Sequence, residues 1–182
     1  MSFAHKKITL FQLLFVSVIV AFLASAQAVP HLGDRNFFND EFYHVEAAQG
    51  MLKTGELVQW DFTHNAPRTT DDGDELTYTR SWVYTMQVVA AVQVFGFSEW
   101  SARLPSVVWY VLLMMTLSCA LLIFTRRLWI ALGTTACVLM MTQLIFYAQF
   151  VRMYAMVITL SLWGALAAYA LLRTVLTPVL LR

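Results

Sequence analysis

Long uncharged stretches alternate with short polar breaks along this chain. Four of these stretches are each long enough to cross a bilayer as a helix, which takes about 20 apolar residues. They are Ile8–Pro30, Leu104–Thr125, Leu128–Val151 and Met153–Leu172. Because backbone polar groups inside lipid must be bonded within their own segment, helices are the expected form. The pattern predicts an all-α polytopic membrane protein with about four transmembrane helices.

A fifth uncharged run, Ser81–Ser98, is marginal at 18 residues. The positive-inside rule bears on whether it crosses. Lys6–Lys7 predict a cytoplasmic N-terminus, and four crossings place Arg126–Arg127, Arg173 and Arg182 on the same cytoplasmic side. A fifth crossing by Ser81–Ser98 would put the Arg126–Arg127 pair outside. We therefore expect Ser81–Ser98 to lie along the outer surface, or dip into it, without crossing.

The N-terminal segment has a second interpretation. Lys6–Lys7, the apolar stretch and Ala26–Ala28 together resemble a signal peptide with an A-x-A cleavage site. The stretch is longer than the usual 7–15 residues and more spans follow it, which favours an uncleaved first helix. In both interpretations Asp40 emerges outside the cytoplasm.

These boundaries predict three regions. Residues 1–30 form a cytoplasmic N-terminus and the first transmembrane helix, residues 31–102 an extracytoplasmic loop with juxtamembrane helices, and residues 103–182 a three-helix transmembrane bundle. The loop is too short for a sizeable core of its own, so it must rest on the membrane helices. A multi-pass protein of the inner or plasma membrane is expected.

Composition agrees with a membrane protein and narrows its partners. Hydrophobic residues make up 59% and charged residues 13% of the chain, and the mean hydropathy is +0.64. These values do not suit a soluble domain. The net charge of +1 gives no sign of nucleic-acid binding. Cys119 and Cys137 lie within predicted spans without metal or redox spacing, so we interpret them as packing residues.

The acidic residues are confined to one region. All eleven lie between Asp34 and Glu99. Within it, a helix is predicted from Asn39, a good N-cap, to about Lys53, with Gly55 as its stop. An acidic pair, Asp40 and Glu41, then occupies the first turn, where the helix dipole favours negative charge. Capping alone would explain this pair; chemistry is the alternative.

Two faces are predicted for this helix. Phe42, Val45, Gln49 and Leu52 recur at three- and four-residue spacing, which makes a mostly apolar face suited to the bilayer interface. A different face carries Asp40, Tyr43, His44 and Ala47.

Four motifs follow one another in an order interleaved with the spans. They are DE-x-Y-x-x-E-A from Asp40 to Ala47, Tyr78-x-Arg80, SEWSARLPS from Ser98 to Ser106, and FVRMYAM from Phe150 to Met156. This ordered set resembles the N-terminal part of GT-C-type membrane glycosyltransferases that use lipid-linked sugars, such as protein O-mannosyltransferases and the aminoarabinose transferases of lipid A. Members of that superfamily usually have about a dozen spans. The chain is therefore expected to be a fragment of a longer enzyme or a split subunit.

The resemblance implies transfer of a hexosyl- or pentosyl-type sugar from a polyprenyl phosphate to an extracytoplasmic glycan, lipid or protein. Asp40 would be the general base that accepts the proton of the attacking group. Glu41 would orient Asp40 or raise its proton affinity. Arg80 and Arg152 would bind the lipid phosphate, since guanidinium matches phosphate oxygens bidentately. Arg103 is a weaker third candidate, with anchoring at the membrane surface as its alternative; snorkelling to the interface is the alternative for Arg152.

Tyr43 and His44 complete the expected substrate-binding set, because they share the helix face of Asp40. His44 lies one turn after Asp40, within reach of a hydrogen bond. No metal and no cofactor is expected. The acidic run Asp71–Glu75 lacks the spacing of an EF-hand loop and reads as a solvated turn, and the histidines lack a paired H-x-x-x-H spacing.

A different class of protein fits the short chain as well. It would be a non-catalytic membrane subunit, or a truncated remnant, that binds a polyprenyl lipid or completes a larger assembly. Further membrane helices would then come from a missing C-terminal part or a partner chain. The length of the chain favours this alternative, whereas Asp40–Glu41 with Arg80 favours the enzyme.

Overall fold

The computed structural model describes residues 8–180, with side chains up to residue 175. Lys6, Lys7 and Arg182, on which part of the topology argument depends, lie outside these residues. The described chain is mostly helical, which confirms the predicted all-α class. Its α-helices are α1 (Leu10–Ala28), α2 (Phe42–Thr54), α3 (Trp82–Phe95), α4 (Glu99–Thr125), α5 (Leu128–Leu139), α6 (Thr142–Ala148) and α7 (Tyr154–Leu180).

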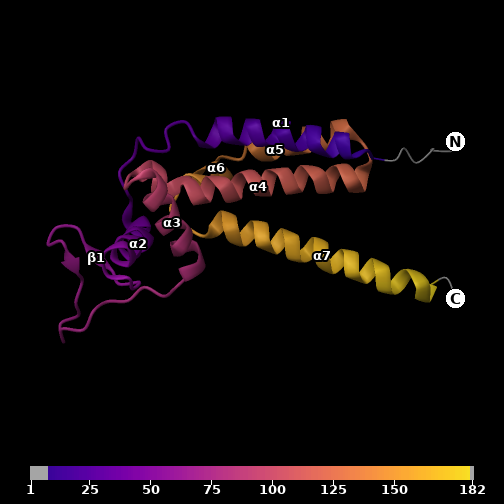
Figure 1. Cartoon of the computed structure of the whole chain (residues 1–182). Coiled ribbons are helices and arrows are strands. Elements are labelled where there is room, and N and C mark those ends of the chain that lie inside the picture. The colour runs from indigo at the N-terminus through magenta and orange to yellow at the C-terminus, as the bar shows by residue number, and fades with distance from the viewer. Residues whose placement is uncertain (1–7, 181–182) are drawn as a thin grey trace.

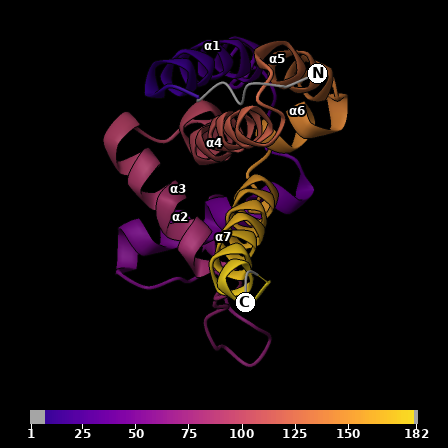
Figure 2. The same cartoon turned by 90° about the vertical axis from the view of Figure 1, so that its right-hand side faces the viewer.

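The long helices form a bundle with α4 in its middle. Figure 1 shows α1, α4 and α7 running lengthwise, while α2, α3 and β1 gather at one end. Viewed along the bundle, α4 lies between α1 and α5 on one side and α7 on the other (Figure 2). Three segments are long and apolar enough to cross a membrane: α1, α4 and Tyr154–Val175 of α7.

The predicted span Leu128–Val151 is not one continuous helix. It divides into α5 and α6, which meet at a bend of 72°, so the chain has three candidate spans, or four if this pair counts as one. The side-chain amide of Gln27 in α1 donates to the carbonyl of Leu139 at the bend, with an N–O distance of 2.7 Å. A break inside an apolar segment is tolerated when a neighbouring helix bonds the freed backbone in this way.

Two helix boundaries differ from the sequence pattern in an informative way. α4 begins at Glu99, five residues before the uncharged run at Leu104, because the Ser98 hydroxyl caps it by accepting from the Ser101 N–H at 3.2 Å. α3 has 14 residues, fewer than the ~20 that a crossing needs. It packs instead against α2 and α4.

The polar insert contains the predicted helix in two parts. A 3₁₀ turn, Asn39–Glu41, leads directly into α2, and Gly55 ends α2 with a φ of 85°. The expectation that Asn39 caps the helix is wrong, because Phe38 takes that position and the Glu41 carboxylate accepts from its N–H at 2.9 Å. Beyond α2, a small antiparallel hairpin that the sequence analysis did not predict pairs β1 (Trp60–Asp61) with β2 (Ala66–Pro67).

The insert and the bundle have separate cores. Val16, Val20 and Ala24 of α1 pack against α4 through residues that include Tyr110 and Met114. Small residues at such contacts let helix backbones approach closely.

In the second core, Val45 of α2 packs with Tyr84 and Val88 of α3. Val45 is therefore buried, while Phe42 and Leu52 of the same predicted face are exposed. The helix face that was predicted to lie on the bilayer interface is therefore partly buried against α3 and partly exposed.

Candidate functional site

Asp40 and Glu41 are neighbours in sequence, but they bind different arginines. The buried Glu41 carboxylate accepts a forked pair of bonds from Arg103, Nε–Oε1 at 2.9 Å and Nη2–Oε2 at 2.8 Å. The backbone N–H groups of Val151 and Phe38 donate to the same two oxygens at 2.8 and 2.9 Å. Glu41 thus ties together the insert, α4 and the segment before α7.

Arg103 is buried and donates through every N–H of its guanidinium. Besides the two bonds to Glu41, it donates to the carbonyl groups of Leu32, Arg35 and Asn36 at 2.8, 2.8 and 3.2 Å. Its guanidinium also lies 5.5 Å from the ring centre of Phe37. A guanidinium has five donors, so none is left for a phosphate. Glu41 and Arg103 thus form a buried cross-link that positions the insert.

Asp40 pairs with Arg152 in a more open place. Arg152 Nη2 lies 2.5 Å from Asp40 Oδ2, and the side chains are 14% and 53% exposed. Asp40 Oδ1 accepts no hydrogen bond from any residue that the structure describes. The Nε–H of Arg152 is buried and likewise has no acceptor among the described residues. In contrast to the Arg103 cross-link, this pair has unused hydrogen-bonding capacity on both sides.

Arg152 also lines a polar cavity of about 510 Å³ where α2, the segment before α3 and the segment before α7 meet. The cavity brings together three of the predicted site residues: Tyr43, Arg80 and Arg152. Its other lining residues are Gln59, Thr77, Tyr78, Thr79, Ser81 and Met153. Two arginines and no acidic side chain face this space, so its chemistry suits an anion.

Tyr43 and Tyr78 form the aromatic part of this cavity. Their rings stack with centroids 5.7 Å apart and an interplanar angle of 14°. Partial burial raises the pKa of the Tyr78 hydroxyl, which keeps it protonated as a donor. Tyr78 belongs to the Tyr78-x-Arg80 motif but was not predicted as a site residue. Its two-residue spacing from Arg80 was the signal that could have identified it.

His44 lies beneath the cavity and is fully buried. Its Nδ1 shares a hydrogen bond with the Thr85 hydroxyl at 2.9 Å, so the predicted bond to Asp40 is not present. The ring meets Tyr78 edge-on at 5.2 Å. Burial, and secondarily the charge of Arg152, lowers the pKa of His44 to about 4. His44 is therefore neutral, and its ring packs edge-on against the ring of Tyr78.

Glu46 is a second buried carboxylate, and it links α2 to the segment that follows β2. Arg68 Nη2 donates to Glu46 Oε1 at 2.7 Å, joining the β2 region to α2. Burial raises the pKa of Glu46, and the nearby Arg68 partly offsets that rise. Glu46, the second glutamate of the DE-x-Y-x-x-E-A motif, thus has a structural contact of its own.

Within the described residues, no three His, Cys, Asp or Glu side chains lie close enough together to hold a metal ion. The acidic run Asp71–Glu75 is an exposed turn with Gly73 at a φ of 90°. Comparison of the chain with known protein families, with curated proteins and with solved structures finds no match.

Proposed function

We propose that this chain is part of a membrane glycosyltransferase that takes its sugar from a polyprenyl-phosphate donor, with Asp40 as the general base. The ordered motifs suggested this function. The observation that carries it is the cavity with two arginines, beside a half-exposed carboxylate, at the end of an apolar helical bundle. The site thus combines positive charge that can bind a phosphate with a carboxylate that can act as a base. Both lie at the end of apolar helices that could bring a lipid-linked donor to the site.

The two arginines receive the donor phosphate in this proposal. Arg80 and Arg152 approach the cavity from the segments that precede α3 and α7. As the bond between the anomeric carbon and the phosphate oxygen breaks, negative charge grows on the leaving phosphate. Fixed cationic donors stabilise such charge most effectively in a site with little water. Tyr43 and Tyr78 provide an aromatic wall of the kind common in small-molecule sites.

Asp40 performs the proton transfer. The acceptor hydroxyl attacks the anomeric carbon, its proton moves to the Asp40 carboxylate, and polyprenyl phosphate departs. In the unliganded chain Asp40 is paired with Arg152, so a donor phosphate competes for that guanidinium and releases the carboxylate. The Arg103 cross-link keeps the backbone of Glu41, and with it Asp40, in place at the cavity.

The experiment is Asp40→Asn, assayed as sugar transfer from a radiolabelled polyprenyl-phosphate sugar in membranes of cells that carry the variant chain in place of the natural one. Asn keeps the size and polarity of Asp but accepts no proton, so transfer should fall by at least ~100-fold. The matched control is Asp34→Asn, because Asp34 is an exposed acid whose carboxylate pairs with the exposed His31. It should leave transfer unchanged.

Two further variants separate the enzyme from the alternative. Arg80→Lys and Arg152→Lys keep the charge but lose the forked geometry, so each should weaken use of the lipid phosphate. Near-normal transfer with Asp40→Asn, at wild-type levels of inserted protein, would refute Asp40 as the base. It would favour the non-catalytic membrane subunit.

A further inference from the structure

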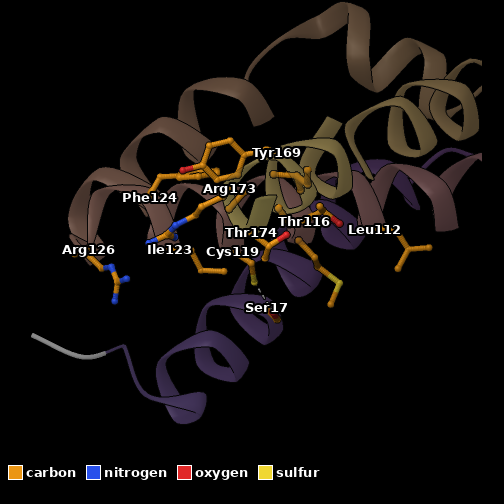
Figure 3. A pocket seen from close by; sticks show the side chains of 14 residues that line it. Ser17, Leu112, Thr116, Cys119, Ile123, Phe124, Arg126, Tyr169, Arg173 and Thr174 are labelled. Carbon is orange, nitrogen blue, oxygen red and sulfur yellow. Dashed lines mark hydrogen bonds between the residues drawn. The ribbon is translucent and has the colours of Figure 1, made fainter. Parts of the chain in front are cut away.

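A second and larger cavity lies at the other end of the bundle, away from the insert. It has a volume of about 1120 Å³ and lies between α4 and α7, with one lining residue, Ser17, from α1 (Figure 3). Its lining residues are Ser17, Leu112, Met115, Thr116, Cys119, Ala120, Ile123, Phe124, Arg126, Leu166, Tyr169, Ala170, Arg173 and Thr174. We call this space the α4–α7 groove. It shares no residue with the cavity at Asp40.

The groove is mostly apolar and open at its side. Ile123, Phe124 and Tyr169 on its rim are 46%, 53% and 49% exposed, so the rim faces the surroundings of the bundle. At its floor the polar atoms of Ser17 and Cys119 satisfy each other at 3.2 Å. A hydrocarbon chain can therefore enter from the side without stranding a polar group of the floor.

Positive charge is confined to one end of the groove. Figure 3 shows Arg126 and Arg173 near one end and Leu112 at the other. No Asp or Glu lines the space. Arg126 follows directly after the last residue of α4, at the end of that candidate span. A basic pocket between membrane helices at this level is the kind of site that binds anionic headgroups.

The groove is longer than the hydrocarbon of one leaflet is deep. From Arg126 to Leu112 α4 advances 14 residues, or about 21 Å at the rise of an α-helix. The hydrocarbon of a single leaflet is about 15 Å deep, half of a bilayer core. An acyl chain whose phosphate lies at Arg126 therefore fits along the groove.

We infer that the α4–α7 groove binds one anionic phospholipid of the bilayer, with an acyl chain along α4 and its phosphate between Arg126 and Arg173. This site does not depend on the proposed transferase activity, since the two cavities lie at opposite ends of the bundle. The bound lipid fills the space between α4 and α7 and links them at that end.

Native mass spectrometry of the full chain, delipidated in detergent, tests the inference. The probes are phosphatidylglycerol and phosphatidylcholine with identical acyl chains, which differ in headgroup charge. The wild type should retain one phosphatidylglycerol in preference to phosphatidylcholine. A basic residue near a membrane surface contributes about fivefold to such binding, so Arg126→Gln with Arg173→Gln should reduce the preference roughly 30-fold.

Two single variants sharpen the result. Arg127→Gln removes the same charge from the next residue, which is exposed and does not line the groove, so it should keep the wild-type preference. Ala170→Trp leaves both arginines in place and fills the groove from an exposed position on α7, so it should lose the bound lipid. Circular dichroism of each variant confirms the helical fold.

Equal retention of both lipids, or equal loss with Arg127→Gln, would overturn the inference. Retention of phosphatidylglycerol by Ala170→Trp would place the lipid elsewhere. A wild-type dimer that binds no lipid would identify a second copy of this chain as the occupant.

Discussion

Arg103 and Arg152 both face the acidic pair at the start of α2, yet they differ in how fully they are bonded. Arg103 donates five hydrogen bonds in a buried place. Arg152 pairs with the half-exposed Asp40 and keeps an Nε–H without a described acceptor. A guanidinium whose N–H groups all have acceptors can only stabilise the fold. A guanidinium with an unbonded N–H at a cavity can still bind a ligand.

The first prediction at this scale concerns the cross-link. Arg103→Met removes the guanidinium that bonds the Glu41 carboxylate and three loop carbonyls, and leaves the buried charge of Glu41 without its cationic partner. Breaking a buried ion pair by removing one partner typically costs about 3–5 kcal/mol, and we expect a loss of that size in the free energy of unfolding. Thermal unfolding in detergent, followed by circular dichroism, measures it. Arg35→Met makes the same chemical change at an exposed residue and should shift stability by about 0.5 kcal/mol or less. Equal stability of the two variants would mean that the cross-link contributes nothing.

His44 provides a prediction about pH. Its pKa is about 4 in the folded chain, against 6.5 for the ordinary side chain. Between these values the unfolded state binds a proton that the folded state does not, so the contribution of His44 to stability is lost as pH falls from 6.5 to 4. The loss amounts to about 3 kcal/mol, from the free energy of one pKa unit.

The measurement compares unfolding free energies across that pH range for the wild type and for His44→Gln, which carries no titrating ring. The variant should lose less stability on acidification. His31→Gln, a change at an exposed histidine, should follow the wild type. Parallel curves for the wild type and His44→Gln would contradict the lowered pKa.

At the scale of elements, the insert depends on a close approach between α2 and the segment that leads to β1. A Cβ on Gly50 would lie 2.0 Å from the carbonyl oxygen of Val58. Gly50→Ala must therefore push the two segments apart, at a cost typical of an overpacked core, about 1–3 kcal/mol. This exceeds the helix propensity that alanine gains. Gly133→Ala in α5, where a Cβ meets nothing within 4 Å, should be neutral or stabilising by up to about 1 kcal/mol. The unfolding midpoint should fall for Gly50→Ala and stay the same or rise for Gly133→Ala.

The break between α5 and α6 is another property of elements. Neither proline nor glycine marks it, since the chain at the bend reads Leu139-Met140-Met141-Thr142. What stabilises the bend is the amide of Gln27, which also accepts a hydrogen bond from the Tyr110 hydroxyl at 3.1 Å. One side chain of α1 thus organises both α4 and the bent pair.

At the scale of the molecule, the polar insert and the Arg126–Arg127 turn lie at opposite ends of the bundle (Figure 1). In a variant without Cys119 and Cys137, Asp72→Cys should therefore react with a membrane-impermeant thiol reagent from outside intact cells. Arg127→Cys should react only after the membrane is permeabilised, because arginine-rich turns face the cytoplasm. Both positions are exposed, so burial does not interfere. Labelling of both from outside would contradict the predicted topology.

The sequence by itself determined the all-α class of the protein, the approximate ranges of most helices and a set of candidate site residues. Uncharged runs of about 20 residues leave a chain little choice but helices in lipid, which is why α1, α4 and α7 were predicted close to their observed ranges. Local signals likewise placed α2 with its end at Gly55. These features depend on residues that are close together along the chain, so they can be predicted from the sequence.

The tertiary structure alone decided which of those residues work together. Asp40 and Glu41 are adjacent, yet Asp40 is half-exposed and pairs with Arg152, which lines a cavity, whereas Glu41 is buried and pairs with Arg103. Partners more than 60 positions away make that division, as does the bond from Gln27 across 112 positions that supports the α5–α6 bend. The α4–α7 groove likewise exists only because two distant helices diverge at one end. Such contacts follow from packing in three dimensions, and no local pattern of hydrophobic and polar residues encodes them.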